Sequence, residues 1–215
     1  MRTSDRTFKR LSTGVEGLDS LLHGGLVSNR LYLVIGNPGT GKTILGMHFL
    51  ATGYENDENV LFIHGEESER DLVANAAEIG IDIENVDFLD IGPESAFFTQ
   101  SQSYDVVKSQ DIQEEELIGN IRDTIEDRDP DRVLIDPISQ LQYIEPDEYQ
   151  FRKRIIAFTR FLKDRDTTVL ATKTPGVQMD EQLRSLSDGV IALEHEDEGR
   201  RIRVPKHRGV GQQDG

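Results

Sequence analysis

The sequence contains no cysteine and no tryptophan, and only 7 of its 215 residues are lysine. Without cysteine, the chain has no disulfide, no thiolate metal site and no cysteine nucleophile. It also lacks any apolar run near the ~18 residues that a membrane-spanning helix needs, and no charged-then-apolar segment opens it. We therefore expect a cytoplasmic protein with no membrane contact.

Basic residues are scarce relative to acidic ones. Lys and Arg total 24 against 40 Asp and Glu, which gives a formal net charge of -16. Such a surface repels a nucleic-acid backbone except at a locally basic patch. Few lysines and many short carboxylates are also typical of a protein adapted to strong brine, because salt screens the repulsion between them. An ordinary acidic protein is the alternative.

Short β-branched runs alternate with longer helical stretches, which predicts an α/β fold with a mainly parallel sheet flanked by helices. The runs at 190–194 and 201–205, around a turn at 197–199, predict a C-terminal β-hairpin. We expect one domain over residues 1–215, with loose ends at 1–10 and 209–215 and an exposed loop over 93–111. The other expected strands are 31–35, 60–64, 86–91, 132–136 and 167–172, and the expected helices are 42–56, 68–80, 113–128 and 147–165.

Residues 36–43 read Gly-Asn-Pro-Gly-Thr-Gly-Lys-Thr and fit the phosphate-binding motif G-x-x-x-x-G-K-[ST] without a gap. They follow a predicted strand and open a predicted helix, which is the context that the motif requires. Glycines allow backbone N–H groups to surround phosphates, and the helix N-terminus adds its positive dipole end. Lys42 is predicted on the β- and γ-phosphates and Thr43 on Mg²⁺. The predicted nucleotide-binding residues of this phosphate loop are Asn37, Pro38, Gly39, Thr40, Gly41, Lys42 and Thr43.

Carboxylates follow two other predicted strands. Asp136 ends the strand 132–136 and is a candidate Mg²⁺ ligand, directly or through a water, although a helix N-cap is the alternative. Glu66 and Glu67 follow the strand 60–64 and are candidates for activating water. Their alternative role is to complement the dipole of the next helix.

These motifs occur together with a Leu-Ser-Thr-Gly-Val-Glu-Gly-Leu-Asp run at 11–19, a Leu-Leu-His-Gly-Gly-Leu run at 21–26 and Lys-His-Arg-Gly at 206–209. The combination covers most of the chain and resembles the KaiC-like ATPases of the RecA superfamily, in a form with one phosphate loop.

The resemblance implies a RecA-like P-loop fold and a regulatory ATPase that hydrolyses ATP with Mg²⁺. It implies homo-oligomeric rings, commonly hexamers, with ATP between subunits, and an unidentified protein partner. By the resemblance, Glu66 and Glu67 activate water, Asp136 supports Mg²⁺ and Thr172 takes the place of a polar γ-phosphate sensor. Lys206 and Arg208 would enter the neighbouring subunit's site and stabilise the transferring phosphoryl group.

The chain departs from the family's pattern at three places. Pro137 follows Asp136 where the family commonly has a small hydroxyl residue. Residues 210–213 are Val-Gly-Gln-Gln, without the hydroxyl residue and the histidine often found there. Residues 177–183 contain no adjacent Ser/Thr pair, so an autokinase activity has little support.

Several alternatives stay open at this point. The C-terminal basic residues have three possible roles: phosphate contacts in a neighbouring subunit, a nucleic-acid-binding patch, or counter-charge for the acidic residues at 194–198. They are Arg200, Arg201, Arg203, Lys206, His207 and Arg208. Strand alternation places Arg201 and Arg203 on one face. A recombinase-like DNA-repair ATPase that binds single-stranded DNA and a nucleotide-sensing scaffold without hydrolysis are the alternative functions. The five histidines show no metal-ligand spacing.

Overall fold

The computed structural model describes residues 8–92, 110–141, 147–176, 180–196 and 199–208. Within these ranges the chain forms a seven-stranded sheet and a small two-stranded sheet. The small sheet pairs β1 (Arg10–Leu11) with β2 (Leu26–Val27). The strands of the large sheet stand in the order β5 (Asp87–Asp90), β4 (Val60–His64), β6 (Arg132–Asp136), β7 (Thr168–Lys173), β3 (Leu31–Gly36), β8 (Gly189–Glu196) and β9 (Gly199–His207).

Neighbouring strands of the large sheet run parallel except for β8 and β9, which form an antiparallel hairpin. Parallel strands need long crossover connections, which helices supply. The predicted α/β fold, with a mainly parallel sheet and a C-terminal hairpin, is therefore confirmed. The predicted strands and long helices agree with the structure to within a few residues.

The sequence pattern does not predict the short elements β1, β2, α1 (Glu16–Leu21) and α8 (Asp180–Leu186). Segments this short carry too little periodicity, and packing rather than propensity stabilises them. Arg10, expected within a loose end, belongs to β1 instead. The predicted loop 93–111 lies outside the described residues except for its last two, which open α5 (Gln110–Arg128).

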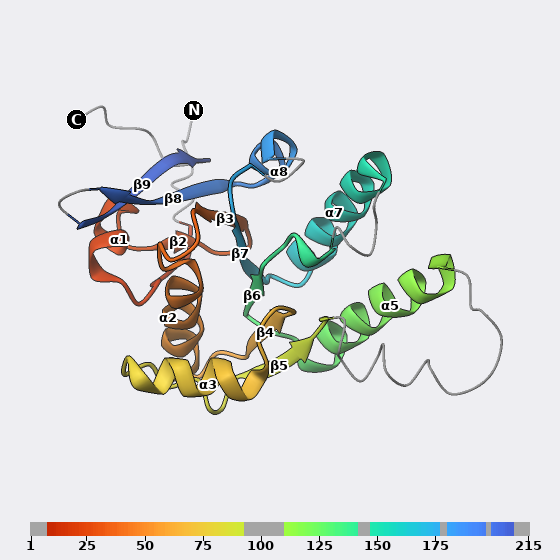
Figure 1. Ribbon diagram of the computed structural model, residues 1–215, viewed down its shortest axis with the longest axis horizontal. Helices are drawn as coiled ribbons and strands as arrows, with labels where there is room; N and C mark the ends of the chain where they lie inside the picture. Colours follow the sequence, from red (N-terminus) through yellow and green to blue (C-terminus); the bar gives the residue numbers. More distant parts are fainter. Residues whose placement is uncertain (1–7, 93–109, 142–146, 177–179, 197–198, 209–215) are drawn as a thin grey trace, which may run out of the picture.

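Helices cover both faces of the large sheet (Figure 1). On one face, α1, α2 (Lys42–Glu55) and α3 (Glu69–Glu78) contribute to one apolar core. On the other face, α5, α7 (Glu148–Lys163) and α8 contribute to a second core. Burial on both sides explains the nearly continuous apolar sequence of the strands. Among the described residues, no helix has both the length and the apolar character that crossing a membrane requires.

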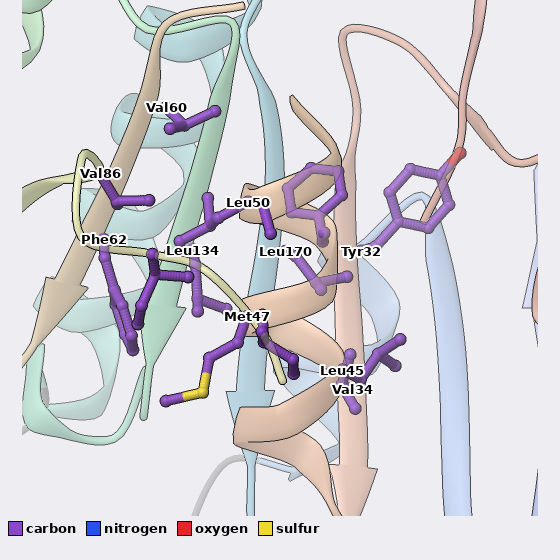
Figure 2. Close-up of a cluster of buried hydrophobic side chains, with 14 of the residues drawn as sticks. Tyr32, Val34, Leu45, Met47, Leu50, Val60, Phe62, Val86, Leu134 and Leu170 are labelled. Carbon is purple, nitrogen blue, oxygen red and sulfur yellow. The ribbon is translucent and has the colours of Figure 1, made fainter. Parts of the chain in front are cut away.

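The strand residues of the core on the α2 side determine which side chains at the strand ends face the same side as the phosphate loop. Figure 2 shows Phe62, Leu134 and Leu170, from three neighbouring strands, packed around Met47 and Leu50 of α2. All three strand residues are fully buried, and each such side chain contributes about 2 kcal/mol relative to exposure. Residues two apart on a strand share a face. The next residues on this face are therefore His64, Asp136 and Thr172, each the last or second-to-last residue of its strand.

Within the run 11–19, the Ser-Thr-Gly part before α1 is bonded to Asp19, which lies in α1. The Asp19 carboxylate accepts hydrogen bonds from the Ser12 and Thr13 hydroxyls at 2.6 Å each and from the Thr13 N–H at 2.8 Å. Arg132 is only 1% exposed and donates to the backbone carbonyls of Ser12 and Phe49. Arg132 therefore holds the run 11–19 against α2, the helix that begins at the phosphate loop.

The register of the β8–β9 hairpin shifts once. Lys206 pairs with Val190 but Arg203 pairs with Ala192, so β9 has one residue more than β8 between these pairs. Such a β-bulge reverses the alternation of faces along the bulged strand. Lys206 consequently lies on the α8 side of the sheet, whereas Ile202 packs into the core on the α2 side.

Candidate nucleotide-binding site

The predicted site residues gather at one edge of the large sheet. The phosphate loop connects β3 to α2, Asp136 is the last residue of β6, and Glu66 follows β4 closely. Thr172 is the second-to-last residue of β7. The strands β4, β6, β7 and β3 are consecutive neighbours, and their carboxyl ends meet where α/β proteins bind ligands.

The phosphate loop has the backbone that its glycines permit. Gly39 and Gly41 have φ angles of +80° and +97°, which residues with a side chain rarely adopt. The Thr40 hydroxyl is buried and donates to the Asn37 carbonyl at 2.8 Å, which closes the loop on itself. The α2 helix begins directly afterwards at Lys42, so its free N–H groups face the loop.

The side chain of Lys42 folds back onto the start of the phosphate loop. Its Nζ donates to the carbonyls of Gly36 at 2.9 Å and Asn37 at 3.2 Å. Burial lowers the pKa of Lys42, and the nearby charges of Asp136 and Glu66 oppose that shift. The charges of both carboxylates therefore act on the ammonium group, which is itself held by backbone carbonyls.

Asp136 is held by its neighbour on β7. The Thr172 hydroxyl, which is fully buried, donates a hydrogen bond to Oδ1 of Asp136. Thr43 follows Lys42 and is half-buried in the first turn of α2. A threonine hydroxyl and an aspartate carboxylate beside the phosphate loop fit Mg²⁺, which takes oxygen ligands. Mg²⁺ at such a site is usually bound by one or two protein oxygens together with substrate phosphates. In the described part of the chain no three His, Cys, Asp or Glu side chains cluster to hold a metal.

The two glutamates differ in orientation. Glu66 is close enough to oppose the pKa shift of Lys42. Oε2 of Glu67 instead accepts a hydrogen bond from Asn75 of α3 at 3.1 Å. Sequence reasoning treats the pair as equivalent, whereas in the structure the Glu67 carboxylate is bound to α3 and Glu66 makes no such contact within the described residues.

The turn end of the hairpin also lies beside the phosphate loop, which the sequence does not predict. Nε2 of His195 is 3.3 Å from the Gly39 carbonyl oxygen. Nη1 of Arg200 is 3.6 Å from the position that a Cβ on Gly41 would take. His195 and Arg200 pair directly across the hairpin. Their location depends on the pairing of β8 with β3, a long-range contact that no local motif signals.

Lys206 and Arg208 lie at the other end of β9. Lys206 Nζ donates to the carbonyls of Ser185 at 3.2 Å and Ser187 at 2.6 Å, and Arg208 donates to Ser185 at 3.1 Å. These carbonyls are at the C-terminus of α8, where the helix dipole favours cations. Burial lowers the pKa of Lys206, the adjacent Arg208 charge adds to this, and Asp188 opposes it.

The register shows how far Lys206 is from its own phosphate loop. Lys206 pairs with Val190, which pairs with Leu33, three residues before β3 ends at Gly36. The separation is about 10 Å across the sheet and about 10 Å along it. Since the side chain also points to α8, the structure does not bring Lys206 together with Lys42.

Arg201 and Arg203 are both exposed and share a face, as the alternation predicts. Arg201 pairs with Glu196 and Arg203 with Glu194, each at 2.7 Å. Of the three roles considered for the basic residues, these ion pairs agree with counter-charge within the hairpin.

A mostly parallel sheet, a phosphate loop between β3 and α2, and carboxylates at the neighbouring strand ends define a RecA-like P-loop ATPase domain. The family model described as "ATPase: KaiC" matches residues 11–215. The chain therefore belongs to the KaiC ATPase family.

The curated relatives are distant and longer. The circadian clock oscillator protein KaiC of Thermostichus vulcanus is 29% identical over 202 residues, which cover 91% of this chain and 37% of the relative. The KaiC protein of Parasynechococcus marenigrum is 31% identical, over 91% of this chain and 39% of its own. A UPF0273 protein of Pyrococcus horikoshii is 30% identical over 143 residues, 64% of this chain and 58% of the relative. The matches thus span less than two thirds of each relative's length.

Proposed function

We propose that this chain binds Mg²⁺-ATP and hydrolyses it to ADP and phosphate. The observation that carries the proposal is the convergence of Lys42, Asp136 and Glu66 at the phosphate loop. A cation inside a backbone-lined loop, with one carboxylate for the metal and one for the water, is what phosphoryl transfer requires. Membership of the KaiC ATPase family supports the same reaction.

Each residue has a distinct role in this proposal. The loop N–H groups and Lys42 hold the phosphates, while Thr43 and Asp136 hold Mg²⁺, with Asp136 oriented by Thr172. When bound, Mg²⁺ neutralises negative charge on the phosphate oxygens. Glu66 accepts the proton of the attacking water.

We also propose that the site is completed by a second copy of the chain, in a homo-oligomeric ring such as a hexamer. Lys206 and Arg208 point away from their own phosphate loop and lie together at the far end of β9. A neighbouring subunit that presents its phosphate loop to this end would receive two cations for the transferring phosphoryl group.

The wider role remains a proposal of the same kind. We assign the chain, as a single domain over residues 1–215, to a regulatory ATPase that acts in the cytoplasm on a protein partner. The net charge of -16 supports a salt-rich working environment and disfavours nucleic acid as the partner. Full activity in dilute buffer without added salt would contradict the adaptation to salt.

The two glutamates provide the test of hydrolysis. Glu66→Gln should lower kcat by about a thousandfold, because it removes the base, with ATP affinity retained. Glu67→Gln is the matched control and should lower kcat less than tenfold, since Glu67 faces Asn75. Phosphate release and ATP binding are measured on the same samples, with the oligomer mass determined with and without Mg²⁺-ATP.

Other outcomes would favour the alternatives. Tight ATP binding without turnover in the unmodified chain would contradict hydrolysis and favour the nucleotide-sensing scaffold. Turnover stimulated by single-stranded DNA in a salt titration would favour the recombinase-like ATPase.

A further inference from the structure

His64 is a buried ionisable residue to which the proposed reaction assigns no role. It is the last residue of β4 and is 2% exposed. Its ring meets Phe62 and Phe88 edge to face, with centroids 5.8 Å and 5.7 Å away. Two aromatic neighbours of this kind fix the plane of the imidazole.

One ring nitrogen of His64 contacts the backbone that carries the two glutamates. Nδ1 lies 2.9 Å from the carbonyl oxygen of Glu67. A carbonyl oxygen only accepts, so Nδ1 carries the hydrogen and donates it. Nε2 is buried and has no hydrogen-bond partner among the described residues.

Glu67 is consequently held at two points. His64 holds the Glu67 carbonyl, and Asn75 holds the Glu67 carboxylate at 3.1 Å. Glu66 lies between β4, which ends at His64, and this held residue, and it is exposed with no hydrogen bond of its own within the described residues. The position of Glu66 therefore depends on the backbone on either side.

We propose that His64 is a positioning residue for Glu66: its Nδ1–H holds the Glu67 carbonyl and so directs the Glu66 carboxylate to the phosphate loop. This inference rests on the proposed hydrolysis and adds the residue that sets the geometry of its base. Small displacements of a catalytic group cost up to about a hundredfold in rate, so the contact has a measurable effect.

Three substitutions separate this role from simple packing. In His64→Asn, the amide nitrogen is as many bonds from Cα as Nδ1 is, so a donor stays in place. His64→Gln moves the donor one bond further out. His64→Leu keeps an apolar side chain between Phe62 and Phe88 and removes the donor.

We expect kcat to fall about a hundredfold in His64→Leu and His64→Gln and less than tenfold in His64→Asn, with ATP affinity unchanged in all three. Thermal stability should follow the opposite order, because leucine suits the apolar site better than asparagine. A packing role predicts that activity follows stability. Equal kcat in the leucine and asparagine variants, or a kcat that follows stability, would overturn the inference.

A second measurement uses the Glu66→Gln background. If His64 acts only through Glu66, adding His64→Leu to Glu66→Gln lowers kcat no further, which is the coupling expected of a shared unit. An additional hundredfold loss would overturn the assignment. Absence of turnover in the unmodified chain would overturn the proposed hydrolysis, and this inference with it. Normal turnover with an unaffected leucine variant would overturn this inference alone.

Discussion

The two ends of the large sheet both carry basic side chains but surround them differently. At the carboxyl ends of the parallel strands, Lys42 lies in a backbone-lined loop with Asp136 and Glu66 nearby. At the opposite end, Lys206 and Arg208 are bonded to backbone carbonyls of α8, with no phosphate loop beside them. The first end therefore has what is needed to bind a nucleotide, whereas at the second end the cations contact backbone carbonyls, with Asp188 as the nearby carboxylate.

This difference indicates how the work is divided within the proposed ring. One end binds Mg²⁺-ATP and supplies the base, and the other supplies transition-state charge to a neighbour. Substitution of a phosphate-binding residue at the first end should then impair nucleotide binding, whereas substitution at the second end should impair only turnover.

The largest effect is expected at the phosphate loop. Lys42→Ala should lower kcat/KM for ATP about a thousandfold or more, because the variant loses a charge-assisted contact in both binding and turnover. Nucleotide binding by calorimetry and phosphate release measure the two losses. Lys153, an exposed residue of α7, provides the matched control: Lys153→Ala should leave both unchanged. Retained hydrolysis by pure Lys42→Ala protein would contradict the site.

A smaller but more diagnostic effect is expected at the far end. Arg208→Ala should lower kcat about a hundredfold and leave ATP binding unchanged. Mixing Arg208→Ala subunits with Lys42→Ala subunits should restore turnover, because each intact phosphate loop can then meet an intact Arg208. Mass measurement of the mixture verifies that mixed oligomers form.

The control for this complementation is the double variant. Subunits that carry both Lys42→Ala and Arg208→Ala should not rescue Arg208→Ala subunits. Mixed oligomers without restored turnover would show that the two ends do not cooperate between subunits.

Arg200 sharpens the comparison because it is at the phosphate-loop end of the same strand. Arg200→Ala should weaken ATP binding about tenfold, the effect of one charged hydrogen bond. Arg201→Ala is the control, since Arg201 is paired with Glu196 and should leave affinity unchanged. Equal affinities of the two variants would remove Arg200 from the site.

The smallest effect concerns stability at the far end, where Nε2 of His207 lies 3.4 Å from the Tyr32 hydroxyl. Burial lowers the pKa of His207 from 6.5, with contributions from Arg10, Arg30 and His23. Below 6.5 the unfolded chain therefore binds more protons than the folded chain. The free energy of unfolding therefore falls as the pH is lowered below 6.5, because protonation favours the unfolded chain.

The check compares the unmodified chain with His207→Gln by urea unfolding at several pH values. The free energy of unfolding should fall more steeply below pH 6.5 in the unmodified chain than in the variant. Parallel curves would show that His207 does not contribute.

Much of the fold follows from local patterns, since buried parallel strands are continuous apolar runs and the apolar residues of α7 repeat at helical spacing. The same holds for the phosphate loop, whose chemistry depends on consecutive residues. The sequence does not resolve the orientation of side chains that depends on tertiary contacts. Glu66 and Glu67 look alike until His64 and Asn75 distinguish them. Arg200 becomes part of the site only because β8 pairs with β3.

The one extra residue in β9 decides which face of the sheet the side chains at its far end take. The bulge acts as a phase shift: before it, Arg203 and Ile202 alternate in step with β8, and after it the sides are exchanged. If the same residues paired without the bulge, Lys206 would turn toward the core on the α2 side and His207 away from Tyr32, although every side chain of the Lys-His-Arg run would remain. The direction of these side chains therefore depends on the bulge as well as on the residues themselves.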